Sequence, residues 1–133
     1  MNRLCKTALW PTVLLATLGV AALSASPAFA VKQFKERFEK RYIKADSAEP
    51  KDAALREAYE KAGCNVCHEG ESKKNRNAYG RALNEYLEKN DKDDDAKIDA
   101  ALEKVESKRS VPGDDKSPTF GELLRQGKLP AGG

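Results

Sequence analysis

The sequence predicts an all-α fold, and three observations lead to this class. Apolar residues recur every three or four positions in five separate segments, which is typical of amphipathic helices. No segment shows the strict apolar–polar alternation of a half-buried strand. Charged residues make up 34% of the 133-residue chain and aromatic residues only 7%. The apolar core of such a small domain would be thin without a cofactor or another source of apolar surface.

The first thirty residues have the pattern of an export leader. Basic residues near the N-terminus precede an apolar stretch over 8–23, and Ala28-Phe29-Ala30 offers a cleavage site. We therefore interpret 1–30 as a signal peptide and expect a mature chain that begins at Val31. The protein is then exported to the periplasm or another extracytoplasmic space. An uncleaved leader is the one membrane attachment that we expect.

Charge and cysteine content narrow the function classes. The chain has 24 Lys and Arg against 21 Asp and Glu, a formal net charge of +3. Arg3 and Lys6 lie in the predicted leader, so cleavage lowers that charge to +1. Nucleic-acid binding therefore has no electrostatic support. Cleavage also removes Cys5, which leaves Cys64 and Cys67 as the cysteines of the mature chain.

Two helices are expected before the centre of the chain. The first covers 31–44, and a connection that contains Pro50 follows over 44–51. Asp52 is expected to cap the second helix, which Gly63 ends. Their apolar faces consist of Val31, Phe34, Phe38 and Tyr42 in the first helix and Leu55, Tyr59 and Ala62 in the second.

Three further helices are expected after a polar loop at 69–74. The third covers 77–90, and Gly80 within it costs about 1 kcal/mol relative to Ala. Such a glycine indicates close packing, and a flat ring is one candidate neighbour. The acidic run 91–95 caps the fourth helix, and 119–122 forms a capping box for a short fifth helix. The expected apolar faces are Tyr79, Leu83, Tyr86 and Leu87; then Ile98, Ala101, Leu102 and Val105; then Phe120, Leu123 and Leu124.

Residues 64–68 read Cys-Asn-Val-Cys-His, and C-x-x-C-H is the attachment signature of a c-type haem. Zinc binding is an alternative, but the motif supplies three ligands and no second cysteine pair exists. A redox dithiol would need a βαβ context, which the helical pattern lacks. A disulfide between the two cysteines would close a tight, strained loop. We favour haem because the leader, the spacing and the helical pattern agree with it.

With a helix that leads into the motif and helices that follow it, the chain resembles small monohaem cytochrome c-like domains. The specific part of the resemblance is the motif itself, and a looser helical resemblance covers 52–126. It implies a small helical domain around one covalent haem c, here assigned to 52–133. The N-terminal helix and its connection, 31–51, are extra to a minimal cytochrome core.

The resemblance also implies roles for particular side chains. Cys64 and Cys67 become the thioether anchors, and His68 becomes the proximal ligand of the haem iron. The other ring nitrogen of His68 is expected to donate to a backbone carbonyl of the 69–76 loop. Arg76 and Arg81 follow the motif closely and are candidate contacts for the haem propionates.

The sequence departs from the family pattern at the sixth iron ligand. His68 is the only histidine, and the only methionine, Met1, lies in the predicted leader. We favour an open or water-occupied position, and we expect the tyrosines Tyr79 and Tyr86 to be core residues. The other donors that remain are lysines, Lys73 and Lys74 included, asparagines and the new α-amino group of Val31.

Three functions follow from these expectations, in order of preference. The first is an exported electron carrier that works with a redox protein partner; a missing methionine argues against a high reduction potential. The second is a domain that binds or senses a small gas at an open iron position. The third is a small peroxidase, which lacks a distal histidine for acid–base work. We therefore expect a carrier or binding protein more than an enzyme.

Overall fold

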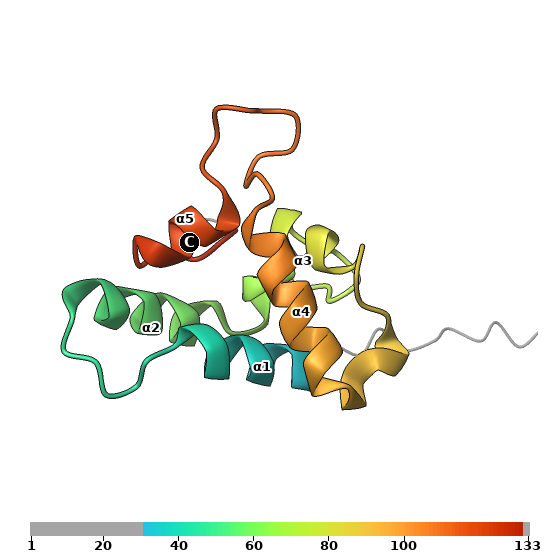
Figure 1. The fold of residues 1–133 in the computed structure, drawn as a ribbon, viewed down its shortest axis with the longest axis horizontal. Helices are drawn as coiled ribbons and strands as arrows, with labels where there is room; N and C mark the ends of the chain where they lie inside the picture. The colour runs from blue at the N-terminus through green and yellow to red at the C-terminus, as the bar shows by residue number, and fades with distance from the viewer. Residues whose placement is uncertain (1–30, 132–133) are drawn as a thin grey trace, which may run out of the picture.

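The computed structural model describes residues 31–131; the predicted signal peptide at 1–30 lies outside the described residues. Every regular element in this part of the chain is helical, which confirms the all-α class (Figure 1). None of these helices is long and apolar enough to cross a membrane. The elements are α1 (Lys32–Tyr42), α2 (Pro50–Ala62), the 3-10 helix η1 (Gly63–Val66), α3 (Ala78–Leu83), the 3-10 helix η2 (Lys89–Asp93), α4 (Asp95–Glu106) and α5 (Phe120–Arg125).

The N-terminal helix α1 packs against α4 and belongs to the same core as the later helices (Figure 1). Phe38 on α1 is 1% exposed, and Ile98 on α4 is fully buried. The expected boundary between 51 and 52 falls in the first turn of α2. The element that the sequence placed outside a minimal core therefore contributes to the only core cluster of the described residues.

Four aromatic rings from four elements meet in this core. The ring centroids of Phe38 and Tyr59 are 5.9 Å apart, those of Phe38 and Tyr79 5.8 Å, and those of Tyr79 and Phe120 5.1 Å. The two pairs that include Tyr79 are edge-to-face, an arrangement that aromatic quadrupoles favour. The expected core positions are confirmed for Phe38, Leu55, Tyr59, Tyr79, Leu83, Leu87, Ile98, Ala101, Leu102, Val105, Phe120 and Leu124.

The second helix begins earlier than predicted. Glu49 is its N-cap and Pro50 its first residue, so the expected cap at Asp52 is wrong. Proline suits this position because its fixed φ is helical and its missing N–H would have no partner there. Asp52 instead lies buried in the first turn, where its carboxylate accepts a 2.6 Å hydrogen bond from the Ser47 hydroxyl.

The third helix is shorter than predicted, because α3 ends at Leu83 and does not continue to residue 90. The chain tightens there, and the Tyr86 N–H donates to the Leu83 carbonyl at 3.0 Å. Leu87 is still only 3% exposed, so its apolar side chain reaches the core from a turn. Glu88 and Asp91 then form a capping box that opens η2.

The caps of the last two helices follow the predictions. Asp94, within the acidic run 91–95, accepts from the Lys97 N–H at 2.9 Å and caps α4. Thr119 and Glu122 form the expected capping box of α5.

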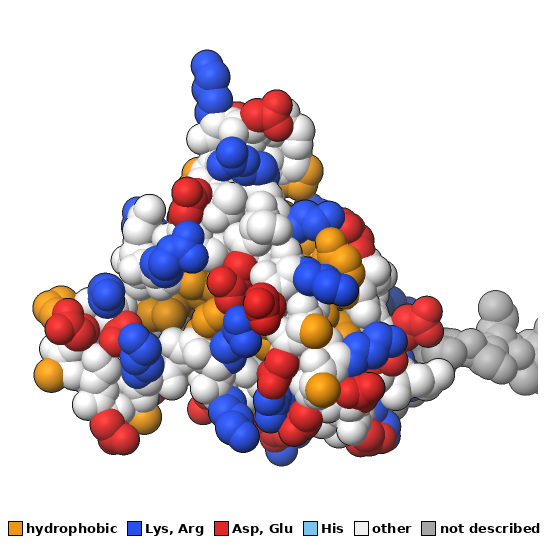
Figure 2. All heavy atoms as spheres, in the orientation of Figure 1, with side chains coloured by type: hydrophobic (Ala, Val, Ile, Leu, Met, Phe, Trp, Pro, Cys, Tyr) orange, Lys and Arg blue, Asp and Glu red, His pale blue; other side chains and the backbone are white. Residues whose placement is uncertain are grey.

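On the face drawn in Figure 2, cationic and anionic side chains are interspersed, with no large area of one sign.

Candidate functional site

The three chemical groups of the C-x-x-C-H motif border one cavity. Cys64, Cys67 and His68 all line a space of about 630 Å³. That volume lies within the range of about 300–1,000 Å³ that is usual for cofactor and ligand sites. Helix α1 supplies one part of the wall, and the segment from 73 to 89 supplies another. The apolar lining consists of Val31, Phe34, Val66, Leu83 and Leu87.

The two thiols differ in their surroundings. Both cysteines are free; Cys64 is exposed, whereas Cys67 is half-buried. Burial raises the pKa of the Cys67 thiol to about 12, so this group is protonated at neutral pH. Val66, between them, is 1% exposed and anchors the segment in the core. The structure thus holds two unpaired thiols at one cavity and gives the disulfide alternative no support.

His68 is oriented by the loop that follows the motif. Its Nδ1 atom lies 3.1 Å from the carbonyl oxygen of Asn75. This confirms the expectation of a carbonyl partner within 69–76. A proton on Nδ1 donates to that oxygen, which leaves the lone pair on Nε2 available to a metal. His68 also forms an isolated antiparallel bridge with Arg76, so the loop folds back along the motif.

Asn77 is a site residue that sequence reasoning did not identify beyond its place at the start of a helix. Its Nδ2 atom lies 2.9 Å from the Asn65 carbonyl oxygen and 3.1 Å from those of Val66 and His68. Its Oδ1 accepts from the Gly80 N–H at 2.9 Å and caps α3. The side chain is buried, with the residue 7% exposed. One amide therefore joins α3 to the motif.

Gly80 has a packing reason in the backbone of the motif, and a flat ring as a further neighbour stays a prediction. A Cβ atom at this position would lie 2.0 Å from the carbonyl oxygen of Cys67. Backbone therefore presses on backbone where α3 crosses the motif. The glycine also borders the cavity. Its cost in helix propensity accompanies this close approach.

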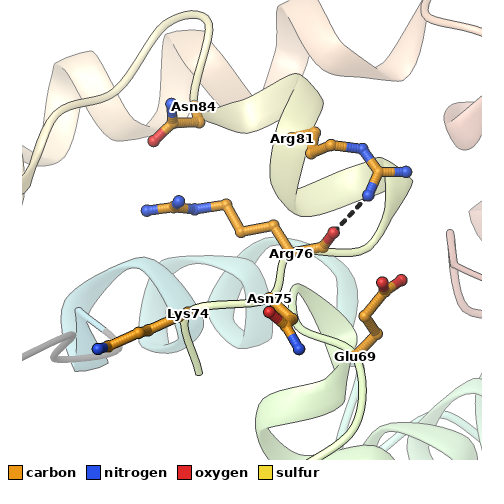
Figure 3. Close-up of a pocket in the computed structure, with 6 residues that line it drawn as sticks. All are labelled: Glu69, Lys74, Asn75, Arg76, Arg81 and Asn84. Carbon is orange, nitrogen blue, oxygen red and sulfur yellow. Dashed lines mark hydrogen bonds between the residues drawn. The ribbon is translucent and has the colours of Figure 1, made fainter. Parts of the chain in front are cut away.

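The two arginines predicted to contact propionates lie in different places (Figure 3). Arg76 lines both the main cavity and a smaller neighbouring one of about 370 Å³. Arg81 lines only the smaller cavity, and its Nη1 donates to the Arg76 carbonyl at 2.5 Å. The guanidinium groups point in different directions. Of the two, only Arg76 reaches the cavity that the motif borders.

Several candidates for a sixth ligand border the main cavity. Val31, Lys73 and Lys74 do so, and the cavity adds three lysines that the sequence did not single out: Lys32, Lys35 and Lys89. Tyr79 is fully buried in the core, and Tyr86 packs partly buried against it, as expected for both. Neither tyrosine is among the residues that line the cavity.

The charged lining of the main cavity is predominantly cationic. It comprises the five lysines at 32, 35, 73, 74 and 89, Arg76, and the three glutamates at 36, 39 and 88. Lys32 is neutralised locally by Glu36, 2.9 Å away on the same helix. The Lys35 ammonium lies 5.0 Å from the centroid of the Tyr59 ring, a cation–π distance. A ligand that carries carboxylates would meet favourable charge here.

Within residues 31–131, no group of three or more His, Cys, Asp and Glu side chains is arranged to hold a metal ion on its own. Among these residues, the two thiols and the imidazole of the motif therefore do not form a ready zinc site, and no fourth ligand joins them. Comparisons with protein-family models, curated proteins and solved structures gave no match. The observations define an all-helical domain with a thiol- and imidazole-lined cavity.

Proposed function

We propose that this chain is an exported c-type haem protein that transfers electrons through one covalently bound haem. Cys64 and Cys67 hold the haem, and His68 is its proximal iron ligand. The observation that carries the proposal is the single cavity shared by these three side chains. Its apolar walls, its volume and its unpaired thiols suit a flat, mostly apolar cofactor with two attachment points.

The haem, when bound, supplies an iron that cycles between the ferrous and ferric states. The remaining work belongs to the chain's own residues. The Asn75 carbonyl holds the imidazole of His68 in one tautomer and orientation. Phe34, Leu83 and Leu87 supply apolar wall to the cavity. Arg76 is the better placed of the two propionate candidates, because Arg81 lies on the smaller cavity.

Electron transfer further requires a partner and a compartment. We propose a redox protein as partner and a location outside the cytoplasmic membrane, where the leader would deliver the chain. The interspersed charges on the face in Figure 2 give no sign of a nucleic-acid surface.

A second candidate function is the binding or sensing of a small gas. The cavity lining contains no methionine and no histidine other than His68, and these are the common protein ligands on the opposite side of a c-type haem. An iron without a strong sixth ligand would bind carbon monoxide or nitric oxide. This candidate uses the same cavity and the same three motif residues.

The test is expression of the full chain in a host that attaches c-type haem. A pyridine haemochrome spectrum of the c type, with haem retained on a denaturing gel, is the expected result. The double variant Cys64→Ser/Cys67→Ser is expected to lose retained haem, whereas Cys5→Ser, in the predicted leader, should keep it. Wild-type protein without covalent haem would overturn the proposal.

The same preparation separates the two candidate functions. Iron that is low-spin in both the ferric and ferrous states and does not bind carbon monoxide would favour electron transfer by a haem with a protein sixth ligand. High-spin ferric iron that binds carbon monoxide after reduction would favour the gas-binding function. Absorption and electron paramagnetic resonance spectra distinguish these states.

A further inference from the structure

We propose that Asn77 is the positioning residue of the haem-attachment segment, which it holds in the shape that presents both thiols and His68 to the cavity. The proposal rests on the proposed haem function and goes further, because it assigns the geometry of the motif to one side chain outside it. Asn77 lies nine residues after His68 and belongs to the next helix as its N-cap.

The hydrogen bonds of Asn77 cover four consecutive carbonyls of the motif. The two N–H groups of the side-chain amide serve the carbonyls of residues 65, 66 and 68, which lie 2.9–3.1 Å from Nδ2, so two of these carbonyls share one N–H. The backbone N–H of Asn77 donates to the remaining one, Cys67, at 3.2 Å. A 3-10 turn that ends at Val66 leaves such carbonyls without helical partners. Asn77 thus supplies the C-terminal cap of the turn that carries Cys64.

The orientation of the amide follows from its neighbours. The Gly80 N–H needs an acceptor, and the three carbonyls need donors, so the oxygen faces α3 and the nitrogen faces the motif. With only 7% of the residue exposed, water cannot easily replace these contacts. The carbonyl that Asn77 does not reach with its side chain is the one against which Gly80 packs.

Asn77 has two roles that different substitutions test separately: its side-chain oxygen caps α3, and its side-chain nitrogen donates to the motif carbonyls. An aspartate at position 77 keeps an oxygen acceptor for the Gly80 N–H, and its charge favours a helix N-terminus. It donates nothing, however, and would place a carboxylate against three carbonyl oxygens. A serine keeps the cap without a charge and is too short to reach all three carbonyls.

The experiment compares full-length Asn77→Asp and Asn77→Ser with wild type, and uses Asn90→Asp as the matched control. Asn90 is exposed on η2 and does not line the cavity, so its variant changes the same functional group and charge. We expect Asn77→Asp to carry on the order of 10-fold less covalent haem per chain, the size of effect typical when a group that orients a metal ligand is lost. The haem that does attach should show altered ferric resonance signals, because Asn77 no longer fixes the backbone that carries His68.

Asn77→Ser should show the same changes to a smaller degree, and Asn90→Asp should match wild type. Helix content from circular dichroism should stay at the wild-type level in Asn77→Ser, since the α3 cap is kept. Hydrogen exchange in the segment 64–68 should be faster in both Asn77 variants. A structural cap alone would leave haem content and the resonance signals unchanged in these variants, and that outcome would overturn the proposal.

One measurement needs no variant. In wild-type protein the side-chain amide protons of Asn77 should exchange slowly with solvent in nuclear magnetic resonance spectra, because they are buried and bonded. Fast exchange would overturn the proposal even if a variant failed to fold. If the wild-type chain attached no haem, the proposed function would fail. Slow amide exchange would then still show the Asn77 hydrogen bonds to the segment 64–68, but not a role in haem attachment. If wild type carried covalent haem and the Asn77 variants carried the same amount with the same resonance signals, only the positioning role of Asn77 would be overturned.

Discussion

The α-carbon of Gly80 packs so closely on Cys67 that a methyl group at residue 80 would meet the Cys67 carbonyl oxygen at 2.0 Å. The two atoms nearest to such a group belong to the backbone of Cys67, which cannot move aside as the end of a flexible side chain would. The position of α3 relative to the motif therefore depends on the absence of a single carbon atom.

Replacement of Gly80 by alanine should consequently separate α3 from the motif. We expect a loss of about 1–3 kcal/mol in the free energy of unfolding from overpacking, reduced by the roughly 1 kcal/mol that alanine returns in helix propensity. Urea unfolding followed by circular dichroism measures the change. Gly80→Ser should be at least as destabilising. A more stable Gly80→Ala protein would contradict the contact.

Tyr79 and Tyr42 form a matched pair for hydroxyl deletion. The Tyr79 hydroxyl is buried and has no hydrogen-bond partner among residues 31–131, and burial raises its pKa well above the ordinary value. Tyr79→Phe should therefore be neutral or stabilise the fold by up to about 1 kcal/mol, because an unsatisfied polar group is removed. The Tyr42 hydroxyl instead donates to Glu106 at 2.8 Å.

Tyr42→Phe should accordingly destabilise the protein by about 1 kcal/mol, the usual worth of a lost hydrogen bond. Thermal unfolding of both single variants in one buffer tests the contrast. Equal destabilisation by the two substitutions would show that the Tyr79 hydroxyl has a partner in solution.

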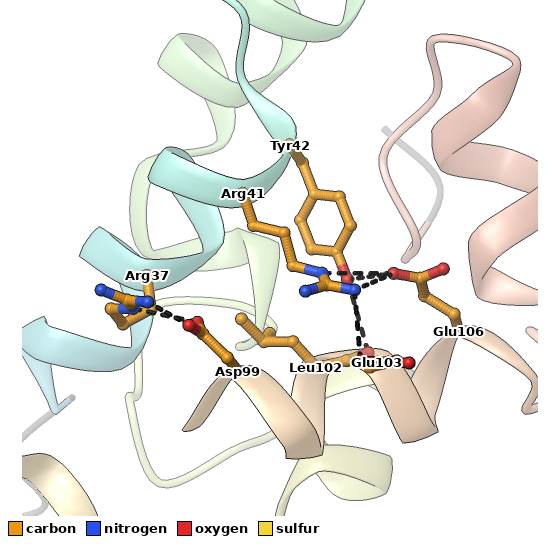
Figure 4. Close-up of polar contacts among 7 residues, drawn as sticks. All are labelled: Arg37, Arg41, Tyr42, Asp99, Leu102, Glu103 and Glu106. Atoms are coloured by element: carbon orange, nitrogen blue, oxygen red, sulfur yellow. Dashed lines mark hydrogen bonds and ion pairs between the residues drawn. The ribbon is translucent and has the colours of Figure 1, made fainter. Parts of the chain in front are cut away.

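Ion pairs fasten α1 to α4 (Figure 4). Arg37 donates from Nε to Asp99 and from Nη1 to Asp95, each at 2.9 Å, and Arg41 pairs with Glu106 at 3.3 Å. Arg37→Ala should lower the urea midpoint. Lys61→Ala, which removes an exposed pair within α2, should leave the midpoint nearly unchanged. High salt should narrow the difference between these variants.

The ion pair between Arg37 and Asp99 makes the free energy of unfolding depend on pH. The hydrogen bond from Arg37 holds the pKa of Asp99 below its usual range. A lowered folded-state pKa contributes stability that is fully present above the unfolded value of about 3.9 and is lost as pH falls through the folded value. Wild type and Asp99→Asn should thus differ by a constant amount at pH 5–7 and converge below about pH 4. Urea midpoints across that range give the comparison, and a gap that widened in acid would contradict the assignment.

The sequence predicts the helical faces well because periodic apolar residues reflect burial directly. Phe38, Tyr59 and Leu102 were expected in the core and lie there. The end of α3 was not predictable in the same way. Leu87 keeps the helical spacing, yet the chain reaches its buried position through a turn after Leu83.

The candidate site shows the same division. The motif itself and a loop carbonyl for His68 follow from local spacing, and the Asn75 contact agrees with that expectation. Asn77 and the α1 wall do not follow from it. A buried amide that caps a turn from a later helix has no periodic signal, and Phe34 reaches the cavity only through the tertiary packing of α1.

Val31 is the first described residue and part of the cavity wall. Cleavage of the predicted leader after Ala30 would leave a free amine at this residue, with an ordinary pKa of about 8. Cleavage would then do more than remove the signal peptide, because it would also add a nitrogen donor to the wall of the main cavity. A peptidase that cut one residue away would move that donor. The iron's access to this amine would therefore depend on the exact cleavage site.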